Sequence, residues 1–156
     1  MSDVSFIIDY AEQGFENYGR VYQGGGPDIA MGFDNSRNRM LIQMARDIGG
    51  LQTKRDQAVV FMGIDDGPSG VLPDTILVSM AGFFRTWLSQ GNDCIFGCFW
   101  GRSRSTYMNS ATMMLITGWN TDKCIGFIGG MRPNIAPMQC FIDQLKRLEP
   151  VLTGVR

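Results

Sequence analysis

The stretch that most constrains the fold runs from Asp93 to Thr106 and reads DCIFGCFWGRSRST. Its first half is a short apolar run, typical of a buried strand that ends at Cys98. A tight loop follows, and a helix is predicted to begin near Arg104, because apolar residues continue as far as Ile116. A strand that stops where a helix starts presents unpaired backbone N–H groups to one concavity, and such concavities bind phosphate-like anions.

Cys98 and Arg104 supply candidate chemistry for that concavity. A helix N-terminus and a nearby guanidinium both favour the thiolate, which is the nucleophilic form of cysteine. Five residues separate Cys98 from Arg104, and this spacing lets the arginine fold back as a fork for two oxygens of a phosphoryl group. The competing interpretation is that Cys98 is only a small buried hydrophobe at the end of a strand.

The pattern C-x-x-G-x-x-R-S that begins at Cys98 resembles the signature loop of the cysteine-dependent protein phosphatases, and in particular that of the dual-specificity branch. A second segment, residues 132–149, is similar to the closing segment of the same family. The matching residues of that segment are Arg132, Pro133, Ile135, Pro137, Phe141, Gln144, Leu145 and Glu149. The two resemblances together span residues 64–149, and the earlier residues match the family only in outline.

The resemblance implies a fold and a reaction. The fold would be a single α/β domain over residues 1–156, with a central, mostly parallel sheet flanked by helices. The reaction would be the hydrolysis of a phosphate monoester through a cysteinyl-phosphate intermediate, without a metal or a cofactor. The implied substrates are phosphorylated proteins that carry phosphotyrosine, phosphoserine or phosphothreonine.

The resemblance also implies roles for individual residues. Cys98 would be the nucleophile, Arg104 would bind phosphoryl oxygens, and Ser105 would help the thiolate to leave in the second step. The phosphate-binding loop would comprise Phe99, Trp100, Gly101, Arg102, Ser103 and Arg104. The family's general acid is an aspartate on a mobile loop upstream of the cysteine. Asp66 matches that position and Asp65 is its rival, while the alternative is that both acids only cap a helix or solvate a turn.

Three positions depart from the family. Gly97 stands where the family has a histidine that helps to hold the cysteine as a thiolate. Trp100 stands where alanine is common, so it is expected either to anchor the loop in the core or to act at the mouth of the site. In the second case Phe99 or Trp100 would narrow the mouth or stack on an aromatic leaving group. Arg102 is expected either to be solvated or to add positive charge beside the pocket.

Composition narrows the classes of function. The chain has 14 Lys and Arg against 15 Asp and Glu, without a long run of like charge, so no nucleic-acid or membrane partner is expected. The absence of histidine excludes Ser-His-Asp triads, Cys-His dyads and His-ligated zinc. The four cysteines lack paired C-x-x-C spacing, so no structural zinc site is expected. Without a basic leader or a long apolar segment, a cytoplasmic or nuclear protein is expected.

The remaining elements are predicted from residue patterns. Strands are expected at 4–10, at 20–23 as a partner of the first, and at 58–64 as a central strand buried on both faces. A packing helix is expected to begin after a cap at Asn35-Ser36, to carry its apolar positions between 40 and 48, and to stop at Gly49-Gly50. Further helices are expected at 74–88, 103–117, 122–131 and 138–148. The glycines at 24–26 are interpreted as a turn, since no Gly-Lys-Ser/Thr follows them.

Other hypotheses stay open at this point. One is a pseudophosphatase that binds phosphorylated partners with little turnover, which Gly97 favours and the presence of Cys98, Arg104 and an acid opposes. Another is a phosphatase that acts on phosphoinositides or on RNA 5′ phosphates, because the sequence does not select the substrate. Rhodanese-like and arsenate reductase enzymes share the Cys-x5-Arg spacing, but segment 132–149 disfavours them. The sequence gives no indication of the oligomeric state.

Overall fold

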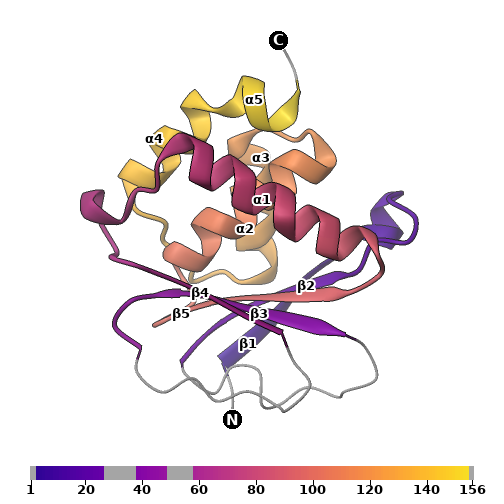
Figure 1. Cartoon of the computed structure of the whole chain (residues 1–156), viewed down its shortest axis with the longest axis horizontal. Coiled ribbons are helices and arrows are strands. Elements are labelled where there is room, and N and C mark those ends of the chain that lie inside the picture. The colour runs from indigo at the N-terminus through magenta and orange to yellow at the C-terminus, as the bar shows by residue number, and fades with distance from the viewer. Residues whose placement is uncertain (1–2, 27–37, 49–57, 155–156) are drawn as a thin grey trace.

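Strand β5 (Asp93–Cys98) lies in the middle of a β-sheet (Figure 1). The computed structural model describes residues 3–26, 38–48 and 58–154, and in these the sheet has five strands. Their spatial order is β1 (Asp3–Asp9), β2 (Arg20–Gly25), β5, β3 (Arg39–Ala45) and β4 (Ala58–Ile64). The pairing of β1 with β2 is antiparallel, and the pairings of β2 with β5, β5 with β3 and β3 with β4 are parallel. This is the expected α/β fold with a mostly parallel central sheet.

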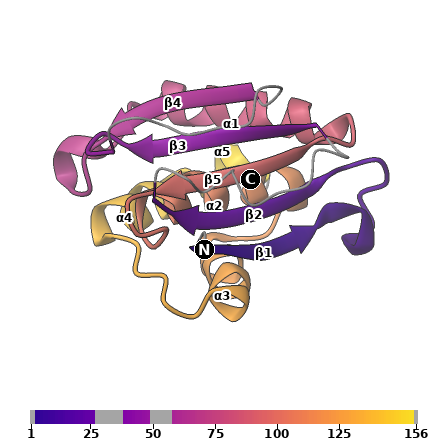
Figure 2. The same ribbon diagram turned by 90° about the horizontal axis from the view of Figure 1, so that it is seen from below.

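The α-helices lie over one face of the sheet, and Figure 2 shows the opposite face from below. Their bounds are α1 (Asp74–Ser89), α2 (Arg104–Thr117), α3 (Thr121–Met131), α4 (Gln139–Arg147) and α5 (Glu149–Thr153). Short 3-10 helices at Tyr10–Gln13 and Pro68–Gly70 follow β1 and β4. Among the described helices, none has the length and apolar composition that crossing a membrane requires.

Strand β5 is buried on both faces, and the alternation of its side chains divides the core. Cys94, Phe96 and Cys98 belong to the main hydrophobic core on the helical side. Ile95 points to the other side, where it packs with Leu41 of β3. Helix α2 is buried from Arg104 to Met114, because it lies between the sheet and the other helices. The signature loop, residues 98–104, therefore joins a buried strand to a buried helix.

The predicted helix over 40–48 is wrong, because this segment is strand β3. All seven of its residues, Arg39–Ala45, are buried. A strand buried on both faces has no polar face, so its sequence lacks the period of two that would identify it. Its closely spaced apolar residues then also satisfy a helical pattern. The predicted cap at Asn35-Ser36 and stop at Gly49-Gly50 lie outside the described residues.

The segment 58–64 is a strand, as predicted, but its predicted central position is wrong. Strand β4 lies at the edge of the sheet, and Val59 and Phe61 are exposed. The strands predicted at 4–10 and 20–23 are confirmed as an antiparallel pair. The predicted helices of the second half of the chain are confirmed to within about two residues, the usual uncertainty of helix ends.

Of the glycines predicted to form a turn, Gly24 and Gly25 belong to strand β2 instead, and Gly25 makes room for the signature loop. Gly25 is the last residue of β2. A Cβ atom there would lie 2.7 Å from the carbonyl carbon of Trp100 and 2.8 Å from the carbonyl oxygen of Phe99. The N–H of Gly26 donates a hydrogen bond to the carbonyl oxygen of Cys98, at 3.1 Å. Close approach of two backbones explains the glycine at position 25, because any side chain would displace the loop.

Candidate active site

The signature loop borders a cleft of about 160 Å³. Cys98 and Arg104 line this cleft from the loop, and Asp66 lines it from the segment after β4. The other lining residues are Trp100, Arg102, Ser103 and Ala136. The fold therefore brings the predicted nucleophile, arginine and acid to one place.

Cys98 is the last residue of β5 and is only 2% exposed. Its Sγ lies 3.2 Å from Oγ of Ser105, a hydrogen bond in which either atom can be the donor. Helix α2 begins at Arg104, so the sulfur lies near a helix N-terminus, where unpaired backbone N–H groups favour the binding of an anion. When the sulfur is a thiolate, Ser105 becomes the donor of this hydrogen bond.

Arg104 is anchored by one end of its guanidinium. Its Nη1 donates to Oδ1 of Asp47 at 2.7 Å and to the carbonyl oxygen of Ile64 at 3.1 Å. Its Nε is buried and has no hydrogen-bond partner among the described residues. A buried N–H without a partner is costly, so this atom is a natural donor to a bound oxyanion. The anchored Nη1 leaves Nε and Nη2 as the two prongs of a fork.

The partner of Arg104, Asp47, follows β3 and is largely exposed. The hydrogen bond from Arg104 holds the pKa of the Asp47 carboxyl below its usual value of 3.8, and partial burial opposes this shift. Asp47 is therefore ionised at neutral pH and gives the guanidinium a fixed negative partner.

The carbonyl groups of the signature loop point toward the body of the protein. The Gly101 oxygen accepts from Nε of Arg132 at 2.8 Å and from Nε2 of Gln23 at 3.1 Å. The Trp100 oxygen accepts from Nη2 of Arg132 at 3.0 Å. Gln23 is itself buried and also donates to Oγ1 of Thr106 at 2.8 Å. These hydrogen bonds fix the backbone of the signature loop on the side that faces the protein interior.

The N–H groups of the signature loop differ from its carbonyls in their hydrogen bonding within the described residues. No backbone N–H between residues 99 and 104 donates a hydrogen bond to any residue of the described part of the chain. Gly101 has φ +66°, and a Cβ atom there would lie 2.4 Å from the carbonyl carbon of Gly24, so only glycine fits the turn. A tight loop with bonded carbonyls and free N–H groups is an anion-binding nest.

The closing segment, residues 132–149, packs against the signature loop. The N–H of Ala136 donates to the carbonyl oxygen of Arg102 at 3.0 Å, and the N–H of Met138 donates to Oγ of Ser103 at 3.0 Å. The two segments that resemble the phosphatase family in sequence are thus in direct contact.

A buried network ties the same closing segment to the chain after Asp66. Tyr107 donates its hydroxyl to Oε1 of Gln144 and accepts from the N–H of Leu72. Nε2 of Gln144 donates to the Leu72 carbonyl at 2.7 Å and to Oδ1 of Asp74 at 2.9 Å. Burial raises the pKa of Tyr107 to about 12, so its hydroxyl keeps its proton and remains a donor. The network holds the far end of the loop that carries Asp66.

The two candidate acids have different surroundings. The carboxylate of Asp65 lies 3.3 Å from Nη1 of Arg46 and accepts from Oγ of Ser69 at 3.2 Å. Asp66 is exposed and lines the cleft, and its side chain has no hydrogen bond or ion pair to the described residues. Of the two carboxylates, that of Asp66 is therefore the one available to a bound substrate.

Trp100 is not a core anchor, because 64% of it is exposed. Phe99 is also exposed, so neither aromatic side chain is buried beneath the signature loop. Arg102 is exposed as well and lines the cleft. The alternative in which the aromatic residues act at the mouth of the site agrees with these positions.

Asp47 and Gln23 are site residues that the sequence analysis missed. Asp47 follows the segment that was predicted as a helix, so its position relative to Arg104 could not be inferred. Gln23 lies two residues after the buried Val21, on the same side of β2, where alternation predicts an apolar side chain. A polar residue at such an inward position was the available signal.

No protein-family model and no curated protein matches this sequence. Solved structures do match it. Human DUSP28 has a TM-score of 0.74 and 21% identity, over 85% of this chain and 89% of that chain. A mouse protein described as a dual specificity phosphatase, in complex with zinc tungstate, has a TM-score of 0.75 and 22% identity, over 86% and 84% of the two chains. PTPMT1 in complex with PI(5)P has a TM-score of 0.68 and 18% identity, over 90% and 95%. This chain therefore has the fold of the dual-specificity phosphatases.

Proposed function

We propose that this protein is a cysteine-dependent phosphatase that hydrolyses phosphate monoesters, and that its substrates are phosphorylated proteins. The observation that carries the proposal is the cleft in which Cys98, Arg104 and Asp66 meet. Its donors, the free loop N–H groups and Nε of Arg104, suit the three peripheral oxygens of a phosphoryl group. The fold neighbours, which include dual-specificity phosphatases, support a phosphatase.

In the first step, the Cys98 thiolate attacks phosphorus in line with the ester oxygen. The S–P bond forms and the P–O bond to the leaving group breaks. Asp66, as the carboxylic acid, gives its proton to the departing oxygen. The loop N–H groups and the fork of Arg104 stabilise the charge on the peripheral oxygens as the transferring group passes between sulfur and oxygen.

In the second step, water cleaves the cysteinyl-phosphate. The Asp66 carboxylate takes a proton from the water, whose oxygen bonds to phosphorus while the S–P bond breaks. The thiolate of Cys98 is restored and inorganic phosphate leaves. Ser105, at 3.2 Å from the sulfur, donates a hydrogen bond to the departing thiolate.

The test compares wild type, Cys98→Ser and Cys124→Ser on an aryl phosphate, with and without a chelator. Cys124 is a buried free cysteine of α3 outside the cleft, which makes it a matched control. We expect turnover in wild type and Cys124→Ser, unaffected by the chelator, and less than about a tenth of it in Cys98→Ser. Acid quenching during wild-type turnover should trap one phosphoryl group on the peptide that contains Cys98.

Tungstate binding by Cys98→Ser completes this test, because the nest and Arg104 survive in that variant. Equal rates in wild type and Cys98→Ser would overturn the proposed reaction. If wild type bound tungstate but turned over no faster than Cys98→Ser, the protein would be a phosphate-binding module and not an enzyme.

A further inference from the structure

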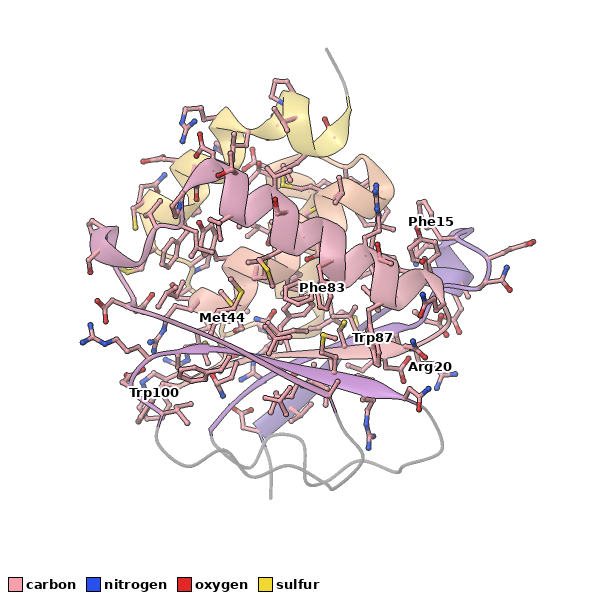
Figure 3. The ribbon with its side chains drawn as sticks, in the orientation of Figure 1. Phe15, Arg20, Met44, Phe83, Trp87 and Trp100 are labelled. Carbon is pink, nitrogen blue, oxygen red and sulfur yellow. The ribbon has the colours of Figure 1, made fainter. Side chains whose placement is uncertain are left out.

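An aromatic pair, Phe99 and Trp100, stands beside the cleft on the signature loop. Trp100 is 64% exposed and Phe99 is 41% exposed. Their rings meet edge to face, with centroids 4.9 Å apart and planes at 67°. Figure 3 shows Trp100 at one end of the sheet, pointing away from the helices. Large apolar side chains that stay exposed next to a site mark a binding surface.

The backbone under the aromatic pair is firmly held. Arg132, only 2% exposed, donates to the carbonyl oxygen of Trp100 and pairs with Asp3 at 2.7 Å. Gly25 lies directly against the backbone of Phe99 and Trp100. A bulky ring on a fixed backbone offers contact area at a low cost in conformational entropy.

A second hollow, the side groove, lies next to the cleft. It has a volume of about 260 Å³ and is lined by Asp3, Gly25, Gly26, Phe99 and Trp100. Trp100 also lines the cleft, so the two hollows adjoin each other at this residue. Sites for drug-sized ligands have volumes of about 300–1,000 Å³. The side groove is smaller than such a site, so its volume suits a single large side chain.

We propose that the side groove binds an aromatic or large aliphatic side chain one or two residues away from the phosphorylated residue of a protein substrate. This inference rests on the proposed function, because it takes the phosphate to lie on the nest. An extended peptide advances about 3.3–3.6 Å per residue, so one or two residues carry the chain across Trp100 into the groove. Arg102, whose Cζ is 5.9 Å from the Trp100 ring centroid, lines the cleft and is not among the described residues that line the groove.

Charge favours a peptide over a lipid surface as the occupant. In the described residues that line the two hollows, Arg102 and Arg104 are matched by Asp3 and Asp66. Proteins that act on anionic membranes present an excess of Lys and Arg beside the inserted aromatic residues. The groove is also concave and has Gly25 in its lining, a shape that receives a side chain instead of entering a bilayer.

The experiment uses two phosphopeptides that differ only in having Phe or Ala at the position after the phosphorylated residue, and a second pair that differs two positions away. The kcat/KM ratio within each pair is measured for wild type, Trp100→Ala and Phe83→Ala. The ratio cancels any effect of a variant on the chemical step. Phe83 is an exposed aromatic residue of α1, 50% exposed and away from both hollows, and serves as the matched control.

We expect wild type and Phe83→Ala to prefer the Phe peptide of one pair by at least about tenfold, the low end of discrimination by hydrophobic pockets. In Trp100→Ala this preference should fall below about threefold. Equal rates for all peptides in an active wild-type enzyme would overturn the subsite and leave the proposed function intact.

A binding measurement tests the side groove independently of the proposed phosphatase activity. Cys98→Ser is titrated with the same peptides, so the preference can be measured without turnover. Tighter binding of the Phe peptide, together with no turnover by wild type, would support the proposed role of the side groove and contradict the proposed phosphatase activity. A preference for vesicles that contain phosphoinositide over every peptide, lost in Trp100→Ala, would replace the peptide occupant by a membrane.

Discussion

The carboxylate of Asp47 accepts a hydrogen bond of 2.7 Å from Nη1 of Arg104, across 57 positions of sequence. The arginine side chain is only 7% exposed, whereas that of Asp47 is 58% exposed. One negative charge at the surface thereby fixes a nearly buried guanidinium whose Nε has no partner among the described residues. We therefore regard Asp47 as a positioning residue that acts through Arg104.

Asp47→Ala should lower kcat/KM for an aryl phosphate by about tenfold, because a guanidinium that can turn holds the phosphoryl oxygens less well. Asp47→Glu should restore part of the rate. Affinity for tungstate should fall in parallel with the rate, which a purely structural role would not produce. Asp143→Ala, which removes an exposed carboxylate of α4, is the control. Unchanged tungstate affinity in Asp47→Ala would contradict the positioning role.

Asp47 should also make a pH-dependent contribution to stability. Its pKa in the folded state is lowered below 3.8, so the carboxylate stabilises the fold above the unfolded value and loses this effect as the pH falls through the folded value. The difference in unfolding free energy between wild type and Asp47→Asn should be full at about pH 7 and should shrink below about pH 4. Added salt should reduce it, since Asp47 is exposed. Urea titrations at several pH values check this, and a difference that grows toward low pH would contradict it.

Asp66→Asn should slow an alkyl phosphate by about 10²–10⁴, the usual span of general acid catalysis. An activated aryl phosphate should lose far less, because its leaving group needs little protonation. Asp65→Asn is the matched control, because its carboxylate is held by Arg46 and Ser69. Equal losses on both substrates, or a larger loss in Asp65→Asn, would assign the proton transfer to another group.

The parts of the site that the sequence predicted are local in the chain. The strand that ends at Cys98, the loop and the helix from Arg104 are one continuous stretch, and Asp66 follows directly on an apolar run. The pairing of Asp47 with Arg104 depends instead on β3 lying beside β5. The order of strands in a sheet depends on how distant segments of the chain pack. Strand β3 is buried on both faces, so its sequence has no alternation of apolar and polar residues by which it could be recognised.

The sequence alone could not decide whether Trp100 is exposed, for a different physical reason. Hydrophobicity alone predicts burial of a tryptophan. The space beneath the signature loop is already occupied by Gln23, whose side chain donates to Thr106 and accepts from Asn109. That network also binds the Gly101 carbonyl, so a ring at position 100 that turned inward would compete with these buried polar groups for space.

Arg132→Met should lower the free energy of unfolding by about 2–4 kcal/mol, because the Trp100 carbonyl would lose its buried donor and the Gly101 carbonyl would keep only Gln23. Asp3→Asn removes only the charged partner of Arg132. Because the Asp3 side chain is 62% exposed, this change should lower the free energy of unfolding by less than about 1 kcal/mol. Urea denaturation of both variants measures the difference. A loss in Asp3→Asn as large as that in Arg132→Met would mean that the ion pair, and not the support of the loop, holds this corner together.

Ser105→Ala should slow the second chemical step more than the first. The hydroxyl of Ser105 lies 3.2 Å from the Cys98 sulfur, and its hydrogen bond strengthens as negative charge returns to the sulfur during cleavage of the S–P bond. With an activated aryl phosphate, the variant should release a rapid burst of the aryl alcohol of about one equivalent, followed by a slow steady rate. The phosphoryl group should accumulate on the peptide that contains Cys98.

Ser110→Ala is the matched control for this variant, because Ser110 is a buried serine of the same helix whose Oγ has no hydrogen-bond partner in the described residues. It should show the wild-type time course. Rapid-quench measurement of aryl alcohol and of trapped phosphoenzyme gives both steps separately. If Ser105→Ala slowed the burst itself and accumulated no phosphoenzyme, the hydroxyl would act on the attacking thiolate and not on the departing one.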